Sequence, residues 1–148
     1  MKNIFVLLFI LLGTLGAKEY KAVFDCSSSD AGYIKSRMWL IDKTMSMIEK
    51  RGDKAEFVIT LHGGCVPMIS KDYDMIVPDE DVKNIKQAQK HLTDLVKNRG
   101  VKVTACAMSL AVNAIEKADV VDFVKISENS FIDTIAYQND GYALMTFK

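Results

Sequence analysis

The chain has 148 residues, and its 19 basic side chains balance its 19 acidic ones to a formal net charge of zero. This length suits a single domain with its own hydrophobic core. Phosphate binding requires clustered Lys and Arg, and the sequence contains no basic block. We therefore expect no nucleic-acid partner.

Residues 1–17 have the three-part layout of a secretory signal peptide. Lys2 supplies a positive charge, residues 4–12 form an apolar run, and small residues lead to Ala17. A membrane span needs about 20 apolar residues, so this run is too short to be one. We expect cleavage after Ala17, a single domain at residues 18–148, a periplasmic or secreted location, and no stable membrane insertion of the mature chain.

The rest of the sequence alternates between short apolar runs and amphipathic segments. Apolar residues recur at steps of three and four from Ile34 to Ile48, which is typical of a helix, whereas residues 57–61 form a nearly continuous apolar run, as in a strand covered on both faces. The predicted order is strand 22–24, helix 34–48, strand 57–61, helix 79–99, strand 101–105, helix 107–118, strand 121–126, helix 130–138 and strand 142–147. This alternation predicts an α/β domain, a three-layer α/β/α sandwich with a mostly parallel five-stranded sheet.

Three cysteines follow the first three predicted strands. Cys26 lies just past the first strand, Cys65 just past the second, and Cys106 at the end of the third. The carboxyl ends of parallel strands meet at one edge of a sheet, where open α/β proteins bind ligands. We therefore expect three thiols on one rim, with His62 among them, and at least one thiol unpaired within the chain.

Cys106 lies between a predicted strand and the first turn of a predicted helix. Free backbone N–H groups and the helix dipole favour an anion at such a place, and a thiolate there has a lowered pKa and raised reactivity. A free cysteine is also often a small buried core residue. The sequence leaves both interpretations of Cys106 open.

The turn after the second strand contains His62, Gly63, Gly64 and Cys65. The glycines either cradle a small ligand or simply turn the chain. His62 and Cys65, together with Cys106 or Met68, form a sulfur and nitrogen set that suits Cu(I) or zinc. No Cys-x-x-Cys pair is present, so we predict neither a metal nor a cofactor.

The polar residues after the first strand carry no recognisable catalytic motif. Asp25 either orients a cation or caps the next helix, and capping is the favoured interpretation. Residues 27–29 are serines without the glycines and lysine of a P-loop. The sequence has no serine nucleophile elbow or dinucleotide fingerprint, so it leaves open whether the protein is an enzyme.

Three motifs share a familiar order along the chain. They are His62-Gly63-Gly64, Gly100-Val101 followed after four residues by Cys106, and the C-terminal Gln-x-x-Gly-Tyr at residues 138–142. Together with the segments between them, they resemble the DsrE/DsrF-like (YchN-like) sulfur-relay family over essentially the whole mature chain.

This resemblance implies a compact α/β/α domain of flavodoxin-like topology that assembles into trimers or hexamers. It also implies that Cys106 carries sulfur as a persulfide between a donor and an acceptor protein, as a sulfur carrier or sulfurtransferase-like protein does. Relatives often have a glycine in place of Cys65, so we expect a Cys65–Cys106 pair to act as a resolving couple, with His62 and Cys26 assisting.

Two other functions remain open at this level. One is a thiol-based module that binds a small ligand or a soft metal on the rim formed by Cys26, Cys65 and Cys106. The other is an oligomeric protein with no chemistry of its own, in which the cysteines are packed or disulfide-bonded.

Overall fold

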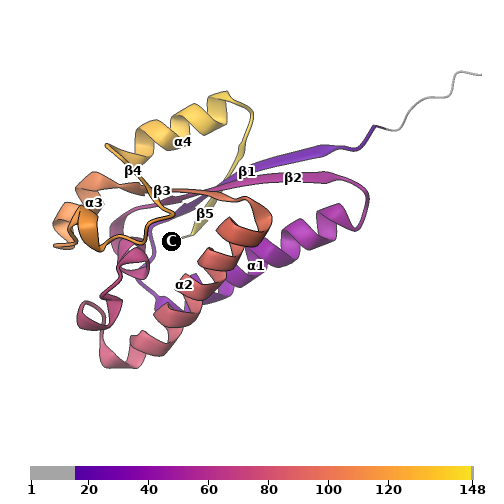
Figure 1. The fold of residues 1–148 in the computed structure, drawn as a ribbon. Helices are drawn as coiled ribbons and strands as arrows, with labels where there is room; N and C mark the ends of the chain where they lie inside the picture. Colours follow the sequence, from indigo (N-terminus) through magenta and orange to yellow (C-terminus); the bar gives the residue numbers. More distant parts are fainter. Residues whose placement is uncertain (1–15, 148) are drawn as a thin grey trace, which may run out of the picture.

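The computed structural model describes residues 16–147, so nearly all of the expected signal peptide lies outside the described residues. Five strands form one sheet in the order β4-β3-β2-β1-β5, and every pairing is parallel (Figure 1). The strands are β1 (Glu19–Cys26), β2 (Lys54–Leu61), β3 (Lys102–Cys106), β4 (Lys125–Ser127) and β5 (Ala143–Phe147). This confirms the predicted parallel five-stranded sheet. The strand order differs from that of flavodoxin, because β1 lies between β2 and the last strand instead of between the second and third.

Helices cover both faces of the sheet, as predicted. They are α1 (Ala31–Glu49), α2 (Asp79–Arg99), α3 (Ala107–Val112) and α4 (Ser130–Asn139), together with 3-10 helices η1 (Gly63–Ile69), η2 (Tyr73–Met75) and η3 (Lys117–Asp119). In Figure 1, α1 and α2 lie side by side beneath the sheet and α4 crosses the opposite face. No helix within residues 16–147 combines the length and apolarity that a membrane crossing requires.

The apolar stripe of α1 builds the main core. The side chain of Asp30 caps the helix by accepting a hydrogen bond from the backbone N–H of Tyr33 at 2.8 Å. The α1 residues buried against the sheet and α2 recur at helical spacing: Ala31, Ile34, Met38, Ile41, Met45 and Ile48. Gly100 then ends α2 with a left-handed φ of 69°, which glycine adopts without strain. These features fix the two helices that seal one face.

The segment between β3 and α4 differs from the prediction. The helix expected over 107–118 ends at Val112, where the Asn113 side chain donates to the Ser109 carbonyl at 2.8 Å. The strand expected over 121–126 is β4, three residues long, at Lys125–Ser127. Val120 forms a bridge with Ser70 beside η1. The apolar run after η3 is therefore partly buried against η1 instead of in the sheet, which is why its pattern resembles a longer strand.

Candidate functional site

All three cysteines lie at the carboxyl edge of the sheet. Cys26 ends β1, Cys106 ends β3, and Cys65 is in η1 just past β2. The strand register places Cys26 beside Leu61 and Leu61 beside Ala105. Successive residues of a strand point to opposite faces, so Cys106 points to the face opposite Cys26. The cysteines thus share an edge but not a face.

Cys26 and Cys65 form a disulfide, with their Cα atoms 5.9 Å apart, in the core between the sheet and helices α1 and α2. Cys106 is the free cysteine. The expected Cys65–Cys106 resolving couple is therefore wrong, because the Cys65 sulfur is bonded on the other face. The soft-metal alternative also loses two thiolate ligands, and residues 16–147 contain no group of three His, Cys, Asp or Glu side chains placed to hold a metal ion.

Cys106 faces α4, and only 5% of its surface is exposed. Burial raises the pKa of its thiol, but hydrogen bonds to the sulfur from the backbone of Ser130, the backbone and side chain of Ser109 and the backbone of Met108 outweigh burial and place the pKa below its usual value. Ser130 is the first residue of α4. The donors therefore come from two helices, whereas the sequence pattern indicates only the one that follows β3.

Beside this thiol, His62 is held by a carboxylate from the neighbouring strand. Its Nε2 lies 3.1 Å from Asp25 Oδ2, while Asp25 Oδ1 accepts a hydrogen bond from the Thr60 hydroxyl at 2.7 Å. The hydrogen bond to Asp25 raises the pKa of His62 against the effect of burial, and the charge of Cys106 acts in the same direction. The expectation that Asp25 caps α1 is wrong, because Asp30 is the cap.

The same pairing shifts the pKa of Asp25 in the opposite direction, downward. Burial raises the pKa of its carboxyl, but the hydrogen bonds with His62 and Thr60 outweigh burial and hold that pKa below its usual value. The side chains of Asp25 and His62 are each 19% exposed. The Asp25 carboxylate and the protonated form of His62 therefore stabilise each other at the edge of the Cys106 site.

The two glycines after His62 serve the turn itself. The N–H of Gly63 donates to Ser109 Oγ at 3.0 Å, and the N–H of Gly64 donates to the Ser27 carbonyl at 3.1 Å. A Cβ on Gly64 would lie 2.7 Å from the Cβ of Ser29. Both N–H groups are engaged within the protein, which favours the turn over a ligand cradle. Gly63 also holds the hydroxyl that reaches Cys106.

Exposed apolar side chains lie on the two helices that supply hydrogen-bond donors to Cys106. The Phe131 ring meets His62 edge-on, with 6.1 Å between ring centroids. We call the exposed apolar residues of α3 and α4 the α3–α4 patch: Met108, Val112, Phe131, Ile132 and Ile135. The patch thus lies on the two helices that begin at the Cys106 site.

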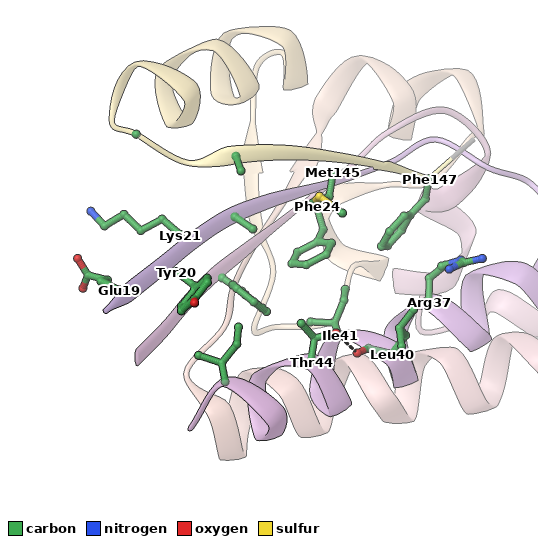
Figure 2. A pocket seen from close by; sticks show the side chains of 15 residues that line it. Glu19, Tyr20, Lys21, Phe24, Arg37, Leu40, Ile41, Thr44, Met145 and Phe147 are labelled. Atoms are coloured by element: carbon green, nitrogen blue, oxygen red, sulfur yellow. Dashed lines mark hydrogen bonds between the residues drawn. The ribbon is translucent and has the colours of Figure 1, made fainter. Parts of the chain in front are cut away.

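A separate apolar groove lies on the other face, between α1 and the β5 edge of the sheet, with a volume of about 480 Å³. Figure 2 shows Phe24 and Phe147 pointing from the strands toward Ile41 of α1, with Arg37 at one end. Neither Cys106 nor His62 lines this groove. It is therefore not part of the thiol site.

A parallel sheet with a single thiolate-stabilising site at its carboxyl edge defines an α/β thiol protein. Residues 21–147 match the model of the DsrE/DsrF-like family. The chain belongs to this family, which is associated with sulfur relay, and the resemblance noted in its motifs is confirmed.

Two similar proteins extend this comparison. A protein of Aquifex aeolicus (strain VF5), described as uncharacterized, is 34% identical over 147 residues, or 99% of this chain and 64% of the relative. This chain thus spans less than two thirds of the relative's length. The solved structure of MTH1491 from Methanobacterium thermoautotrophicum, a protein of unknown function, matches 86% of this chain and 99% of its own, with a TM-score of 0.67 and 15% identity. That likeness shows the fold.

Proposed function

We propose that this protein is an exported sulfur carrier in which Cys106 accepts sulfane sulfur and passes it on as a persulfide. One observation carries the proposal: the free thiol of Cys106 receives hydrogen bonds from three backbone groups and from the Ser109 hydroxyl. These donors favour the thiolate, which is the form that attacks sulfur. The association of the family with sulfur relay supports the same chemistry.

Sulfur transfer at this thiolate needs no external oxidant. With thiosulfate as donor, the Cys106 thiolate attacks the outer sulfur, the S–S bond of thiosulfate breaks, and its electron pair leaves with sulfite. An acceptor thiolate then attacks the outer sulfur of the Cys106 persulfide and releases Cys106 as a thiolate. The donors that stabilise the attacking thiolate also stabilise this leaving group, so one arrangement serves both steps.

Mass spectrometry of the intact protein after incubation with polysulfide tests the proposal. We expect a gain of about 32 Da, the mass of one sulfur atom, that dithiothreitol removes. Oxidation to a sulfinic acid adds nearly the same mass but resists dithiothreitol, so the reduction step separates the two. The Cys106→Ser variant, which keeps the disulfide, is the control and should gain nothing. A wild-type protein without a reducible adduct would support an oligomer with no sulfur chemistry instead.

We also propose that the chain is exported to the periplasm or secreted. The signal-peptide layout of residues 1–17 and a fully buried disulfide support this location, since disulfides persist in oxidising compartments. Expression of the full chain in a bacterium, followed by fractionation and N-terminal sequencing, should give a periplasmic protein that begins at Lys18. An uncleaved chain in the cytosol with Cys26 and Cys65 reduced would contradict export.

A trimer or hexamer is the proposed assembly, and a sulfur donor or acceptor protein is the proposed partner. The α3–α4 patch supports both, because side chains such as Ile132, 62% exposed, are large apolar groups of the kind that interfaces cover. Sedimentation equilibrium should give a multiple of the chain mass that Ile132→Asp lowers. The control is Met75→Asp, on η2 away from the patch and 86% exposed. A wild-type monomer would contradict the assembly.

A further inference from the structure

We infer that Asp25 and Thr60 are positioning residues for the thiol site: they fix His62 as an imidazolium whose second ring nitrogen gives a proton to the group that leaves when Cys106 takes sulfur. The donor that needs this proton is the persulfide of a thiol. The substrate class rests on the sulfur-carrier function proposed above, whereas the positioning of His62 does not.

The Asp25 carboxylate is held in place by a partner on each of its two oxygens. Asp25 and Thr60 are paired residues of β1 and β2, and the Thr60 side chain is fully buried. Each oxygen of the carboxylate has its own partner, Thr60 Oγ1 at 2.7 Å and His62 Nε2 at 3.1 Å. A separate hydrogen bond to each oxygen fixes the orientation of the carboxylate. A largely buried carboxylate is stable only when it is paired, and His62 supplies a positive charge for that pair.

The surroundings of His62 contain few other charges. Asp25 on β1 and Cys106 at the end of β3 are the titratable groups that act on it. The nearby helices η1 and α3 contain no Asp, Glu, Lys or Arg. On α4, Phe131 presents its ring to His62, and Asp133 bonds to the Ser127 hydroxyl. The pairing with Asp25 is therefore the largest influence on the charge of the His62 imidazole.

The hydrogen-bond pattern decides which nitrogen does the chemistry. An imidazolium donates from both ring nitrogens, and Nε2 is engaged by Asp25. Nδ1 is the nitrogen that remains for the reacting groups. His62 and Cys106 are close enough for the charge of Cys106 to act on the pKa of His62. The geometry agrees: His62 precedes Gly63, whose N–H donates at 3.0 Å to Ser109 Oγ, and the Ser109 hydroxyl bonds to Cys106.

This arrangement fits a leaving group that needs a proton. When the Cys106 thiolate attacks the outer sulfur of R–S–S⁻, the S–S bond breaks and its electron pair leaves with the inner sulfur as RS⁻. An ordinary thiol has a pKa of about 8.5, so the thiolate RS⁻ is basic enough to take the Nδ1 proton and become RSH. The products are the Cys106 persulfide anion, a neutral imidazole and RSH, so charge and atoms balance. Sulfite is a weaker base than such a thiolate, so its departure depends less on this proton.

The pH profile of Cys106 alkylation by iodoacetamide tests the positioning of His62. Cys26 and Cys65 are bonded, so the reagent reports on Cys106 alone. We expect Asp25→Asn to slow alkylation at pH 7 about threefold or more by moving the profile to higher pH, and Thr60→Val to move it in the same direction. Thr104→Val is the matched control, because Thr104 is the register partner of Thr60 on β3. Profiles that stay at the wild-type position in folded Asp25→Asn and Thr60→Val would overturn the inference.

A measurement on the wild-type protein is independent of how the variants fold. The chain has two histidines, and the imidazole signals of both can be followed by NMR during a pH titration. His91 lies on α2, on the other face, and serves as an internal reference in the same sample. We expect the His62 midpoint to lie above that of a histidine in an unstructured peptide. A midpoint at or below that value would overturn the inference.

Two sulfur donors separate this inference from the proposed function. We expect Asp25→Asn to slow sulfur transfer from glutathione persulfide, whose leaving group is a thiolate, at least threefold more than direct transfer from thiosulfate, whose leaving group is sulfite. Equal slowing with both donors would overturn the substrate class. If the wild type forms no persulfide but Asp25→Asn still shifts the alkylation profile, the proposed function fails and the positioning of His62 stands.

Discussion

The two faces of the sheet treat cysteine in opposite ways at the same edge. On the face beneath α1 and α2, Cys26 and Cys65 are bonded to each other and fully buried among apolar side chains. On the face beneath α4, Cys106 is free and surrounded by hydrogen-bond donors, with His62 and Asp25 nearby. Cysteine chemistry here follows from the face and its partners rather than from the position along the chain. The disulfide stabilises the fold, and the separate thiol is left for reaction.

Removing the disulfide should have the largest effect on this contrast. We expect Cys26→Ala combined with Cys65→Ala to lower the free energy of unfolding by about 3–4 kcal/mol, because the bond closes a loop between residues 39 positions apart. Urea denaturation followed by circular dichroism measures this loss. At pH 7 the alkylation rate of Cys106 should stay at the wild-type value. A large change in that rate would show that the two faces are coupled.

Gly64→Ala should have an intermediate effect, because it strains the turn between the two faces. The added Cβ would meet the backbone of Ser29 at 2.8–2.9 Å, a contact that no side-chain rotation relieves. We expect a loss of about 1–3 kcal/mol in the free energy of unfolding, measured by urea denaturation. Gly32→Ala in α1 is the control, since its Cβ would have ordinary contacts and alanine favours a helix. An equally large loss in Gly32→Ala would contradict this account of Gly64.

The smallest expected effect concerns one donor on the reactive face. Ser109→Ala removes a hydroxyl that bonds to Cys106 and accepts from the Gly63 N–H. Since backbone donors remain, we expect a weakening of about 1 kcal/mol, seen as alkylation about fivefold slower at pH 7. Ser36→Ala, an exposed serine on α1, should leave the alkylation rate unchanged. A wild-type rate in Ser109→Ala would show that the backbone groups alone stabilise the thiolate.

The sequence predicts the layers of the fold well because the spacing of apolar residues shows which side of each element is buried. The helical spacing from Ile34 to Ile48 and the apolar run of residues 57–61 each correspond to one buried element. The same property explains the misplaced fourth strand. Val120 is buried, but against η1, and an apolar pattern does not say which partner buries it.

The sequence predicts which edge of the sheet holds the candidate site, but it does not predict which face of the sheet each cysteine points to. Strand ends place all three cysteines on the rim, whereas the strand register is what separates Cys26 from Cys106. The pairing of Asp25 with His62 was missed because a carboxylate shortly before a helix is typical of a helix cap. One signal was available: Thr60 is a polar residue in an apolar run and lies two positions before His62, so both point to one face. A buried hydroxyl there implies a polar partner, which is Asp25.

The position of β5 has a consequence for the order in which the molecule is built. Among residues 16–147, β1 is the first strand to be synthesised, yet one of its two neighbours is the last strand, β5. The Phe147 ring packs at a tilt against Phe24, with 5.7 Å between centroids, and the Phe147 carbonyl accepts from the Ser27 N–H at 3.0 Å. β1 therefore lacks one of its two neighbours until that final strand leaves the ribosome. Under the export proposed above, this late pairing favours a chain that reaches the secretion channel before its sheet is complete.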